Sequence, residues 1–267
     1  MKKTLFYAML FFSSTLRAEP VQNLANYSYF CFAVNKSISY TGTCFLYQKN
    51  NQIFVVSNYH VFYAADLLGK KQVMHVDTLR IRYISNCTNK PKYYKIVNDQ
   101  DKVEFFKHYD SPDLMAKRID NIPDDMPVYL INDLIEPSYF NESPESVMLF
   151  GYPAINTRVD GPDQVEVKQC ALEGGFDNRL EKFTSENVDG IKDEAVLKEV
   201  NRKITDKEFG IGVASLPGFS GSPVYGKFEK DGREYYKFIG VVFAANQANN
   251  FSVVIKGKVF FDFIKNI

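Results

Sequence analysis

The sequence predicts an all-β fold, either a barrel or a sandwich. Short runs of β-branched and aromatic residues lie between turn residues along most of the chain, which is typical of strands joined by tight connections. Aromatic residues make up 15% of the chain, through 23 Phe and 17 Tyr with no Trp, and such residues suit half-buried strands. A length of 267 residues, 45% of them hydrophobic, is enough for a sizeable core in one large domain or two small ones.

The strands are predicted, in chain order, over Tyr27–Val34, Gly42–Gln48, Ile53–Ser57, Thr78–Ile84, Tyr93–Val97, Ser146–Phe150, Gln164–Cys170, Ile211–Ala214, Ser222–Lys227, Tyr235–Ala244 and Phe251–Ile255. An acidic, proline-rich stretch from Pro123 to Pro144 interrupts them and is interpreted as a linker between two halves. The best helix is predicted over Lys192–Ile204, where apolar residues recur at four-residue spacing, and a second helix over Val259–Ile264.

Charge and the first residues bear on partners and location. Basic and acidic residues balance, at 32 Lys+Arg against 32 Asp+Glu, so nucleic acid is not expected as the main partner. Lys2 and Lys3, an uncharged and mostly apolar run over Thr4–Leu16, and Ala18 have the layout of a secretory signal peptide over residues 1–18. The run is shorter than the roughly 20 residues that span a bilayer. We therefore expect an exported bacterial protein, periplasmic or secreted, without a membrane span in the mature chain; a buried N-terminal helix is the alternative.

Four cysteines follow this segment: Cys31, Cys44, Cys87 and Cys170. The even number allows two disulfides in an oxidising compartment, and a Cys31–Cys44 bond is the first pairing expected if the segments around them are neighbouring strands. Free buried thiols are the alternative. The spacing contains no CxxC pair and the chain has 3 histidines, so neither a metal site nor a cofactor is predicted.

The segment from Leu216 to Val224 carries the strongest chemical signal. It contains Ser220 between Gly218-Phe219 and Gly221, and a serine flanked by glycines can occupy a tight turn that exposes its hydroxyl. The backbone N–H groups of such a turn can converge as an oxyanion site. A plain loop is the alternative. The nucleophile elbow of the α/β-hydrolases fits poorly, because the second glycine follows the serine directly and the surroundings are strands.

A nucleophilic serine needs a base and a group that orients the base. His60 is the candidate base because it follows an apolar run, at a strand end where a side chain can point into a cleft. His75 and His108 lack such a setting and are interpreted as surface or packing residues. Asp113 heads an apolar strand and is the candidate to orient the imidazole, with Asp110 as the close competitor.

The order His60, Asp113, Ser220 resembles the chymotrypsin-like (trypsin-fold) serine peptidases. Four segments look like the bacterial branch that includes the exported Deg-type peptidases, here without a PDZ-type domain after Ile267: Gly42-Thr43-Cys44-Phe45, Ser57-Asn58-Tyr59-His60-Val61, Gly151-Tyr152-Pro153 and Gly218-Phe219-Ser220-Gly221-Ser222-Pro223. The resemblance covers roughly Tyr27 to Ile255.

This resemblance implies two six-stranded antiparallel β-barrels with the active site between them. After residues 1–18, residues 19–135 would form the barrel that carries His60 and Asp113, and residues 136–267 the barrel that carries Ser220. A short C-terminal helix and a helical insertion in the second barrel, within the charged segment Glu173–Lys207, complete the expected fold.

The resemblance also implies an activity, that of a serine endopeptidase acting on protein or peptide substrates without a cofactor. Ser220 would attack the peptide carbonyl, His60 would carry the proton, Asp113 would orient His60, and the N–H groups of Gly218 and Ser220 would bind the oxyanion. Phe219 stands where trypsin-like zymogens have an aspartate that pairs with a freed N-terminus, so that activation switch is not expected. The expected walls of the first substrate pocket carry no charge, which predicts cleavage after small or medium apolar residues: Ala214, Ser215, Leu216, Phe243, Ala244 and Ala245.

Two other classes of function stay open. A pseudo-peptidase would keep the barrels as a protein-binding module without catalysis. An unrelated exported β-protein would match these motifs by chance, and its three candidate side chains would then lie far apart. The sequence does not predict an oligomeric state.

Overall fold

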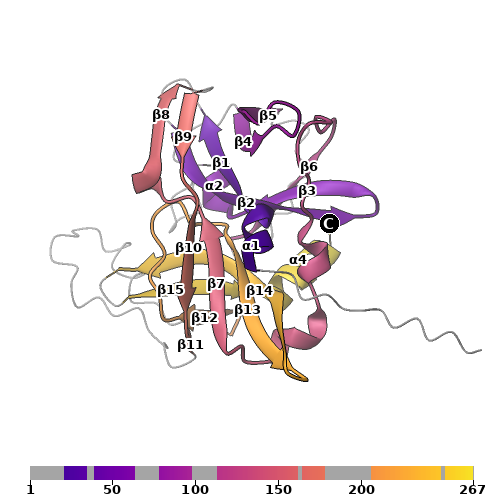
Figure 1. Cartoon of the computed structure of the whole chain (residues 1–267), viewed down its shortest axis with the longest axis vertical. Helices are drawn as coiled ribbons and strands as arrows, with labels where there is room; N and C mark the ends of the chain where they lie inside the picture. Colours follow the sequence, from indigo (N-terminus) through magenta and orange to yellow (C-terminus); the bar gives the residue numbers. More distant parts are fainter. Residues whose placement is uncertain are drawn as a thin grey trace, which may run out of the picture.

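The computed structural model describes residues 21–34, 39–63, 78–97, 113–161, 164–177, 206–247 and 250–266. Two antiparallel sheets, of six and seven strands, lie one above the other in Figure 1, and a two-stranded hairpin stands beside the upper one. The predicted all-β class is therefore confirmed. In the described part of the chain, no helix is both long and apolar enough to cross a membrane.

The first sheet has the strand order β5-β4-β1-β2-β3-β6. Its strands are β1 (Tyr29–Val34), β2 (Ser39–Lys49), β3 (Gln52–Ser57), β4 (Thr78–Ile84), β5 (Pro91–Val97) and β6 (Met115–Ile119). All six strands send side chains into one hydrophobic core, which requires the sheet to curl around it. Side chains alternate along β2, with Cys44 and Leu46 in this core and Phe45 in a second core on the opposite face.

The second sheet has the strand order β10-β7-β13-β14-β15-β12-β11. Its strands are β7 (Ser146–Gly151), β10 (Cys170–Gly174), β11 (Phe176–Asp177), β12 (Glu208–Ile211), β13 (Pro223–Lys230), β14 (Arg233–Asn246) and β15 (Phe251–Lys256). The sheet has one strand more than the six expected, because the two-residue strand β11 pairs with β12 at the edge. Its own core lies on one face and includes Val147, Val224 and Val254.

The hairpin of β8 (Thr157–Gly161) and β9 (Gln164–Val167) leaves the second sheet and covers the outer face of the first. Val165 of β9 packs there against Phe30 and Phe32 of β1, and its N–H donates to the Tyr93 hydroxyl at 3.0 Å. The sequence predicted one strand over Gln164–Cys170, whereas the structure ends β9 at Val167 and begins β10 at Cys170. The chain passes from one layer to the other between these strands.

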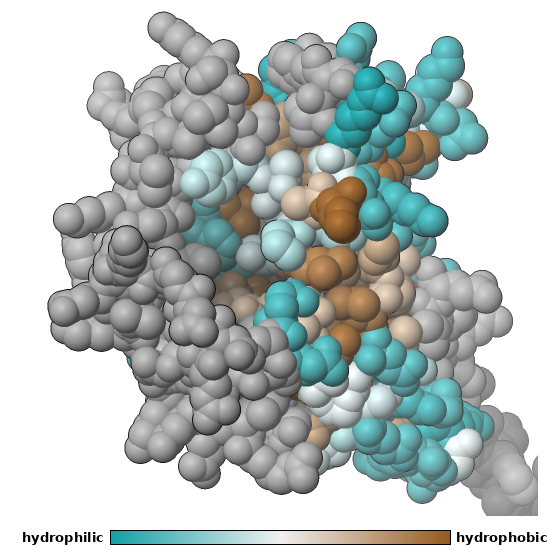
Figure 2. Space-filling model, turned by 90° about the vertical axis from the view of Figure 1, so that its left-hand side faces the viewer, coloured by the Kyte–Doolittle hydropathy of each residue, from teal (hydrophilic) through white to brown (hydrophobic). Residues whose placement is uncertain are grey.

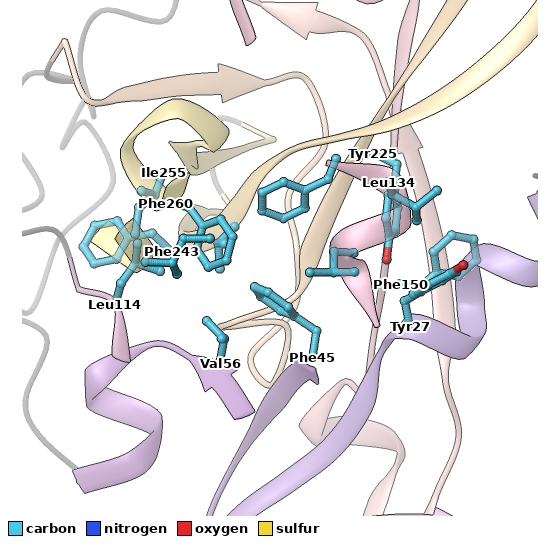
Figure 3. Close-up of a cluster of buried hydrophobic side chains, with 14 of the residues drawn as sticks. Tyr27, Phe45, Val56, Leu114, Leu134, Phe150, Tyr225, Phe243, Ile255 and Phe260 are labelled. Carbon is cyan, nitrogen blue, oxygen red and sulfur yellow. The ribbon is translucent and has the colours of Figure 1, made fainter. Parts of the chain in front are cut away.

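The largest core lies between the two sheets (Figure 3). Phe45 and Val56 of the first sheet meet Tyr225 and Ile255 of the second, and Phe260 of the C-terminal helix α4 (Gly257–Lys265) closes one side. This helix confirms the one predicted over Val259–Ile264 and is longer by a few residues. Short helical turns complete the described elements: α1 (Val21–Leu24), η1 (Ala25–Tyr27), α2 (Tyr59–Tyr63), η2 (Ile131–Leu134), η3 (Pro137–Asn141) and η4 (Ala154–Asn156).

One predicted strand is wrong, and one predicted helix lies outside the described residues. The strand predicted over Ile211–Ala214 is wrong, since β12 ends at Ile211 and the next residues form a bend. The helix predicted over Lys192–Ile204 and most of the insertion lie outside the described residues.

The expected Cys31–Cys44 disulfide is absent, and all four cysteines are free thiols. In the β1–β2 register Cys31 lies opposite Gly42, and Cys44 lies opposite Tyr29. The two cysteines are therefore diagonal neighbours in the core of the first sheet, where their thiols interact without a bond between them. Burial raises the pKa of the Cys44 thiol well above its usual value, which keeps it protonated and unreactive.

Candidate active site

His60 and Asp113 are brought into direct contact at one end of the first sheet. The Nδ1 atom of His60 makes a short hydrogen bond with a carboxylate oxygen of Asp113, and the two side chains are 12% and 9% exposed. His60 lies in the first turn of α2, where backbone N–H groups have no partner within the helix. Its N–H instead donates to the other carboxylate oxygen of Asp113 at 3.1 Å. Asp113 thus fixes both the ring and the backbone of His60, which leaves the Nε2 atom as the remaining ring nitrogen for chemistry.

Asn58 holds the backbone on which this pair depends, and the sequence reasoning did not single it out. The Asn58 side chain is fully buried, and its Nδ2 atom donates to the Asp113 carbonyl at 2.7 Å. The Asn58 carbonyl accepts the N–H of Val61 at 3.2 Å and so begins helix α2. One residue therefore ties the start of the histidine helix to the strand entry that carries the carboxylate. Its place two residues before His60 was the available signal.

Ser220 occupies a double turn that only glycines can complete. Phe219 N–H donates to the Leu216 carbonyl, and Ser222 N–H donates to the Phe219 carbonyl, so two tight turns follow each other. Gly218 has φ +100° and Gly221 has φ +85°, in the region that residues with a Cβ rarely adopt. Neighbouring groups also leave no room for a side chain at Gly221, because a Cβ there would lie 2.1 Å from Ser57 Oγ.

Strand β2 brings this turn to the histidine helix. Thr43 N–H donates to the Ser220 carbonyl at 3.0 Å. A Cβ on the preceding residue, Gly42, would lie 3.2 Å from the same carbonyl oxygen and 2.6 Å from a methyl group of Val61, the residue after His60. Ser220 and the His60 helix therefore approach the same glycine. His60 and Asp113 are thus in direct contact, and the turn of Ser220 lies near their helix through Gly42.

The backbone before Ser220 is oriented in a way that leaves two donors available. The Pro217 carbonyl accepts the Ala154 N–H at 2.7 Å, and the Phe219 carbonyl accepts the Ser222 N–H at 2.8 Å. Because a trans peptide points its N–H away from its C=O, the N–H groups of Gly218 and Ser220 face away from these partners. Neither N–H donates a hydrogen bond to any group in the described residues. A pair of donors with these properties can stabilise an oxyanion.

The candidate pocket walls are joined by polar side chains that the sequence reasoning missed. Ser215 is buried, and its N–H donates to Ser252 Oγ at 2.7 Å, while Ser252 Oγ donates to the Val213 carbonyl at 2.7 Å. Gln247 Nε2 donates to the Ser215 carbonyl at 2.5 Å. Asn250 Oδ1 accepts the Ala214 N–H at 3.3 Å. Polar residues are common in turns, so the turn between β14 and β15 gave no separate signal for this role.

The residues named as pocket walls differ in exposure. Leu216 is 37% exposed, and Ala244 and Ala245 are half-buried, so all three can face a ligand. Phe243 is 8% exposed and belongs to the core between the sheets, where Figure 3 shows it near Leu114 and Ile255. The β14–β15 register shifts between Val242 and Ala244, and this irregularity accompanies the inward position of Phe243. Phe243 therefore packs in the core between the sheets.

Apolar side chains also reach the surface beside the serine turn. Ile155 in η4 is 84% exposed, and Leu216 is the other exposed apolar residue next to Pro217. The hydrogen bond between Ala154 and Pro217 joins their two segments. Figure 2 shows apolar residues across the middle of the left-hand face of Figure 1, at the level where the two sheets meet, with hydrophilic residues above and below. Asp110, His75 and His108 lie outside the described residues.

Phe219 anchors the serine turn in the core of the second sheet. Its ring is fully buried in the core of the second sheet, and a Cβ on Gly151 would lie 2.5 Å from its Cδ1 atom. The Gly218 carbonyl in the same turn accepts the Thr43 hydroxyl at 2.9 Å. The turn is thus anchored by apolar burial on one side and by a hydrogen bond from the first sheet on the other.

Comparison with solved structures identifies the fold. The chain is similar to an HtrA-type protease, AlgW with a tripeptide, at 14% identity and a TM-score of 0.50, over 92% of this chain and 62% of that one. It is similar to the serine endoprotease from Yersinia pestis at 12% identity and a TM-score of 0.50, over 92% of this chain and 64% of that one. It is also similar to the catalytically active tobacco etch virus protease complexed with product, at 13% identity and a TM-score of 0.50, over 98% of this chain and 87% of that one.

These likenesses show the trypsin-like serine protease fold, as the sequence motifs predicted. The chain spans a little under two thirds of the length of the two bacterial neighbours. No protein-family model and no curated protein matches the sequence.

Proposed function

We propose that this protein is a serine endopeptidase that hydrolyses peptide bonds through an acyl-enzyme intermediate. The observation that carries the proposal is the attachment of His60 to Asp113 through both its ring and its backbone N–H, beside a glycine turn that holds Ser220. A histidine held by a buried carboxylate is oriented in the tautomer that can accept a proton at Nε2. The likeness to solved protease structures, which shows the trypsin-like fold, supports the same proposal.

In the proposed mechanism, Ser220 Oγ attacks the carbonyl carbon of the peptide bond while His60 Nε2 takes the hydroxyl proton. The carbonyl oxygen takes the electron pair of the C=O π bond and becomes an oxyanion, which accepts hydrogen bonds from Gly218 N–H and Ser220 N–H. His60 then gives its proton to the leaving nitrogen, the C–N bond breaks, and an ester of Ser220 remains. Water, deprotonated by His60, attacks that ester and releases the carboxylic acid with the serine restored.

Substrate preference and location complete the proposal. The walls formed by Ala214, Leu216 and Ala244 carry no charge, and the polar side chains that join them are neutral, which supports cleavage after small or medium apolar residues. We propose export as well, because residues 1–18 have the composition of a signal peptide. Proteins or peptides outside the cytoplasm would then be the substrates.

The test is labelling with a fluorophosphonate probe, followed by mass-spectrometric mapping of the modified residue. Such probes react with a serine that has both a base and an oxyanion site. We expect the label on Ser220 alone, no label in Ser220→Ala, and a large loss of labelling in His60→Ala. Digestion of a peptide library by the same protein would then show the residue that precedes the cleaved bond.

Two results would contradict parts of this proposal. A folded sample that takes no label would favour a pseudo-peptidase that keeps the fold as a binding module. Cleavage that follows charged residues would refute the apolar preference while leaving the mechanism intact.

A further inference from the structure

One cavity lies away from the proposed catalytic residues. It has a volume of about 410 Å³ and is lined by residues of η1, by the end of β4, by the segment at Pro127–Tyr129, and by Tyr152 and Gln169. None of His60, Asp113 and Ser220 lines it. We call this cavity the Arg82 pocket, after the only charged side chain in its lining. Its volume is within the range of pockets that hold small organic ligands, roughly 300–1,000 Å³.

Arg82 brings an uncompensated positive charge to this pocket. Its Nε atom is sealed from solvent and makes no hydrogen bond within the described residues. Burial raises the pKa of the Tyr152 hydroxyl, and the Arg82 guanidinium opposes that rise, which places the charge close to the phenol. A buried guanidinium donor without a partner is costly, because charged groups lose their hydration on burial. A carboxylate bound in the pocket would bring a negative charge to this guanidinium, since Arg82 is part of the lining.

Asp125, a carboxylate that contacts two residues of the pocket lining, is engaged with other partners. Asp125 accepts hydrogen bonds from the hydroxyls of Ser85 and Tyr83, and it forms an ion pair with Lys92 at 2.7 Å. Asp125 does not line the pocket, and the polar side chains that do are neutral. Arg82 therefore lines a space whose lining contains no carboxylate.

Exposed apolar side chains also lie at this pocket. The described residues include five large apolar side chains that are well exposed, and three of them lie here: Ile84 at 40%, Val128 at 38% and Tyr129 at 38%. Ile84 and Tyr129 line the pocket directly, and Val128 is the neighbour of Tyr129. Such clustering of exposed apolar residues marks a binding surface more often than chance exposure does. The pocket thus combines one cation with an apolar rim.

We propose that the Arg82 pocket binds a carboxylate that carries an apolar group. The guanidinium would bind the carboxylate with two parallel N–H···O bonds, which is the geometry that arginine favours. Ile84 and Tyr129 would cover the apolar group. The last residue of a peptide with a free carboxylate and a small free organic acid both have this chemistry.

The experiment compares N-acetyl-leucine with its amide, N-acetyl-leucinamide, by calorimetric titration of the Ser220→Ala protein. The two probes differ only in the charge that Arg82 would recognise, and the background removes turnover. We expect the acid to bind about tenfold to a hundredfold more tightly than the amide, the usual effect of a hydrogen bond to a charged group. Arg82→Gln should abolish this preference, whereas Arg118→Gln, which removes an exposed arginine of β6 outside the pocket, should preserve it.

Two further measurements make the outcome decisive. Ile84→Ser keeps the charge and should weaken binding of the acid and of the amide equally, so the proposal can be tested even if Arg82→Gln unfolds.

A tripeptide ending in leucine with a free carboxylate should bind more tightly than N-acetyl-leucine if the ligand is a chain end, and no more tightly if it is a free acid. Equal binding of acid and amide overturns the proposal. So does an acid preference that survives in folded Arg82→Gln protein, because the carboxylate would then bind elsewhere, as at the proposed oxyanion site. Neither result depends on whether the protein is a peptidase.

Discussion

Replacing Gly42 by alanine should separate the proposed base from the proposed nucleophile. A Cβ at Gly42 would lie 2.6 Å and 2.8 Å from the two γ-carbons of Val61, and 3.2 Å from the Ser220 carbonyl oxygen. Carbon atoms in contact prefer about 3.5–4.0 Å, so the α2 helix and strand β2 must move apart by about 1 Å. Gly42 has no positive φ, so an alanine there tests contact distance and not backbone strain.

The size of the effect follows from this displacement. A shift of about 1 Å at a reacting group typically lowers the rate by about 10²-fold, and overpacking a core costs about 1–3 kcal/mol of stability. The measurement is the second-order rate of Ser220 labelling by a fluorophosphonate, which needs no known substrate. Thermal unfolding of the same samples checks that the protein remains folded.

The matched control is the double variant Gly42→Ala/Val61→Ala, which deletes both γ-carbons that the new methyl group would meet. We expect the double variant to label at least about tenfold faster than Gly42→Ala alone, since neighbouring substitutions of this kind are coupled. The contact with Ser220 remains, so recovery should be partial. Full labelling of the single variant, or no recovery in the double variant, would show that Gly42 does not set the distance between the two groups.

Three more predictions concern the carboxylate, the buried ring and the acid stability. Asp113→Asn should lower the labelling rate by about 10⁴-fold with the fold intact, because the asparagine favours the wrong histidine tautomer; an unchanged rate would remove Asp113 from the mechanism. Phe219→Ala should lower the free energy of unfolding by about 3–5 kcal/mol in denaturant titrations, since the ring is fully buried against Gly151. Lys92 and the Ser85 hydroxyl hold the pKa of Asp125 below its ordinary value, so its contribution to stability is present above that value and is lost as the pH falls through the lowered pKa. Asp125→Asn should therefore flatten the acid side of a melting-temperature profile, and a profile that stays as steep would refute the assignment.

The fold class and the motif order could be predicted because each rests on local signals. Strand β4 matches its predicted bounds, Thr78–Ile84, because β-branched and aromatic residues alternate there with polar ones between clear turn residues. Gly218 and Gly221 flanked the candidate serine in the sequence, and the positive φ of both explains why glycine is needed. A glycine beside a candidate serine indicates a backbone conformation that other residues rarely adopt, so a single sequence is enough to find such positions.

What the sequence could not predict depends on register and on contacts between distant segments. The Cys31–Cys44 disulfide required the two residues to face each other, and a two-residue offset in the β1–β2 register makes them diagonal instead. The roles of Asn58 and Ser252 come from hydrogen bonds to backbone atoms far along the chain, at Asp113 and at Ser215. No local pattern encodes which distant carbonyl or N–H group a buried polar side chain will meet.

The same distinction bears on whether the proposed enzyme would need activation. In the sequence, Phe219 indicated only that a charge-based switch is missing. In the structure, its buried ring and the Thr43–Gly218 hydrogen bond both hold the turn in the conformation that directs two N–H groups away from their neighbours. Reversing the two peptides would break the hydrogen bonds that their carbonyls accept from Ala154 and Ser222, so we predict that the turn needs no freed N-terminus. Labelling of Ser220 in freshly purified, unprocessed protein should therefore proceed without a lag, and a lag that shortens after limited proteolysis would contradict this reasoning.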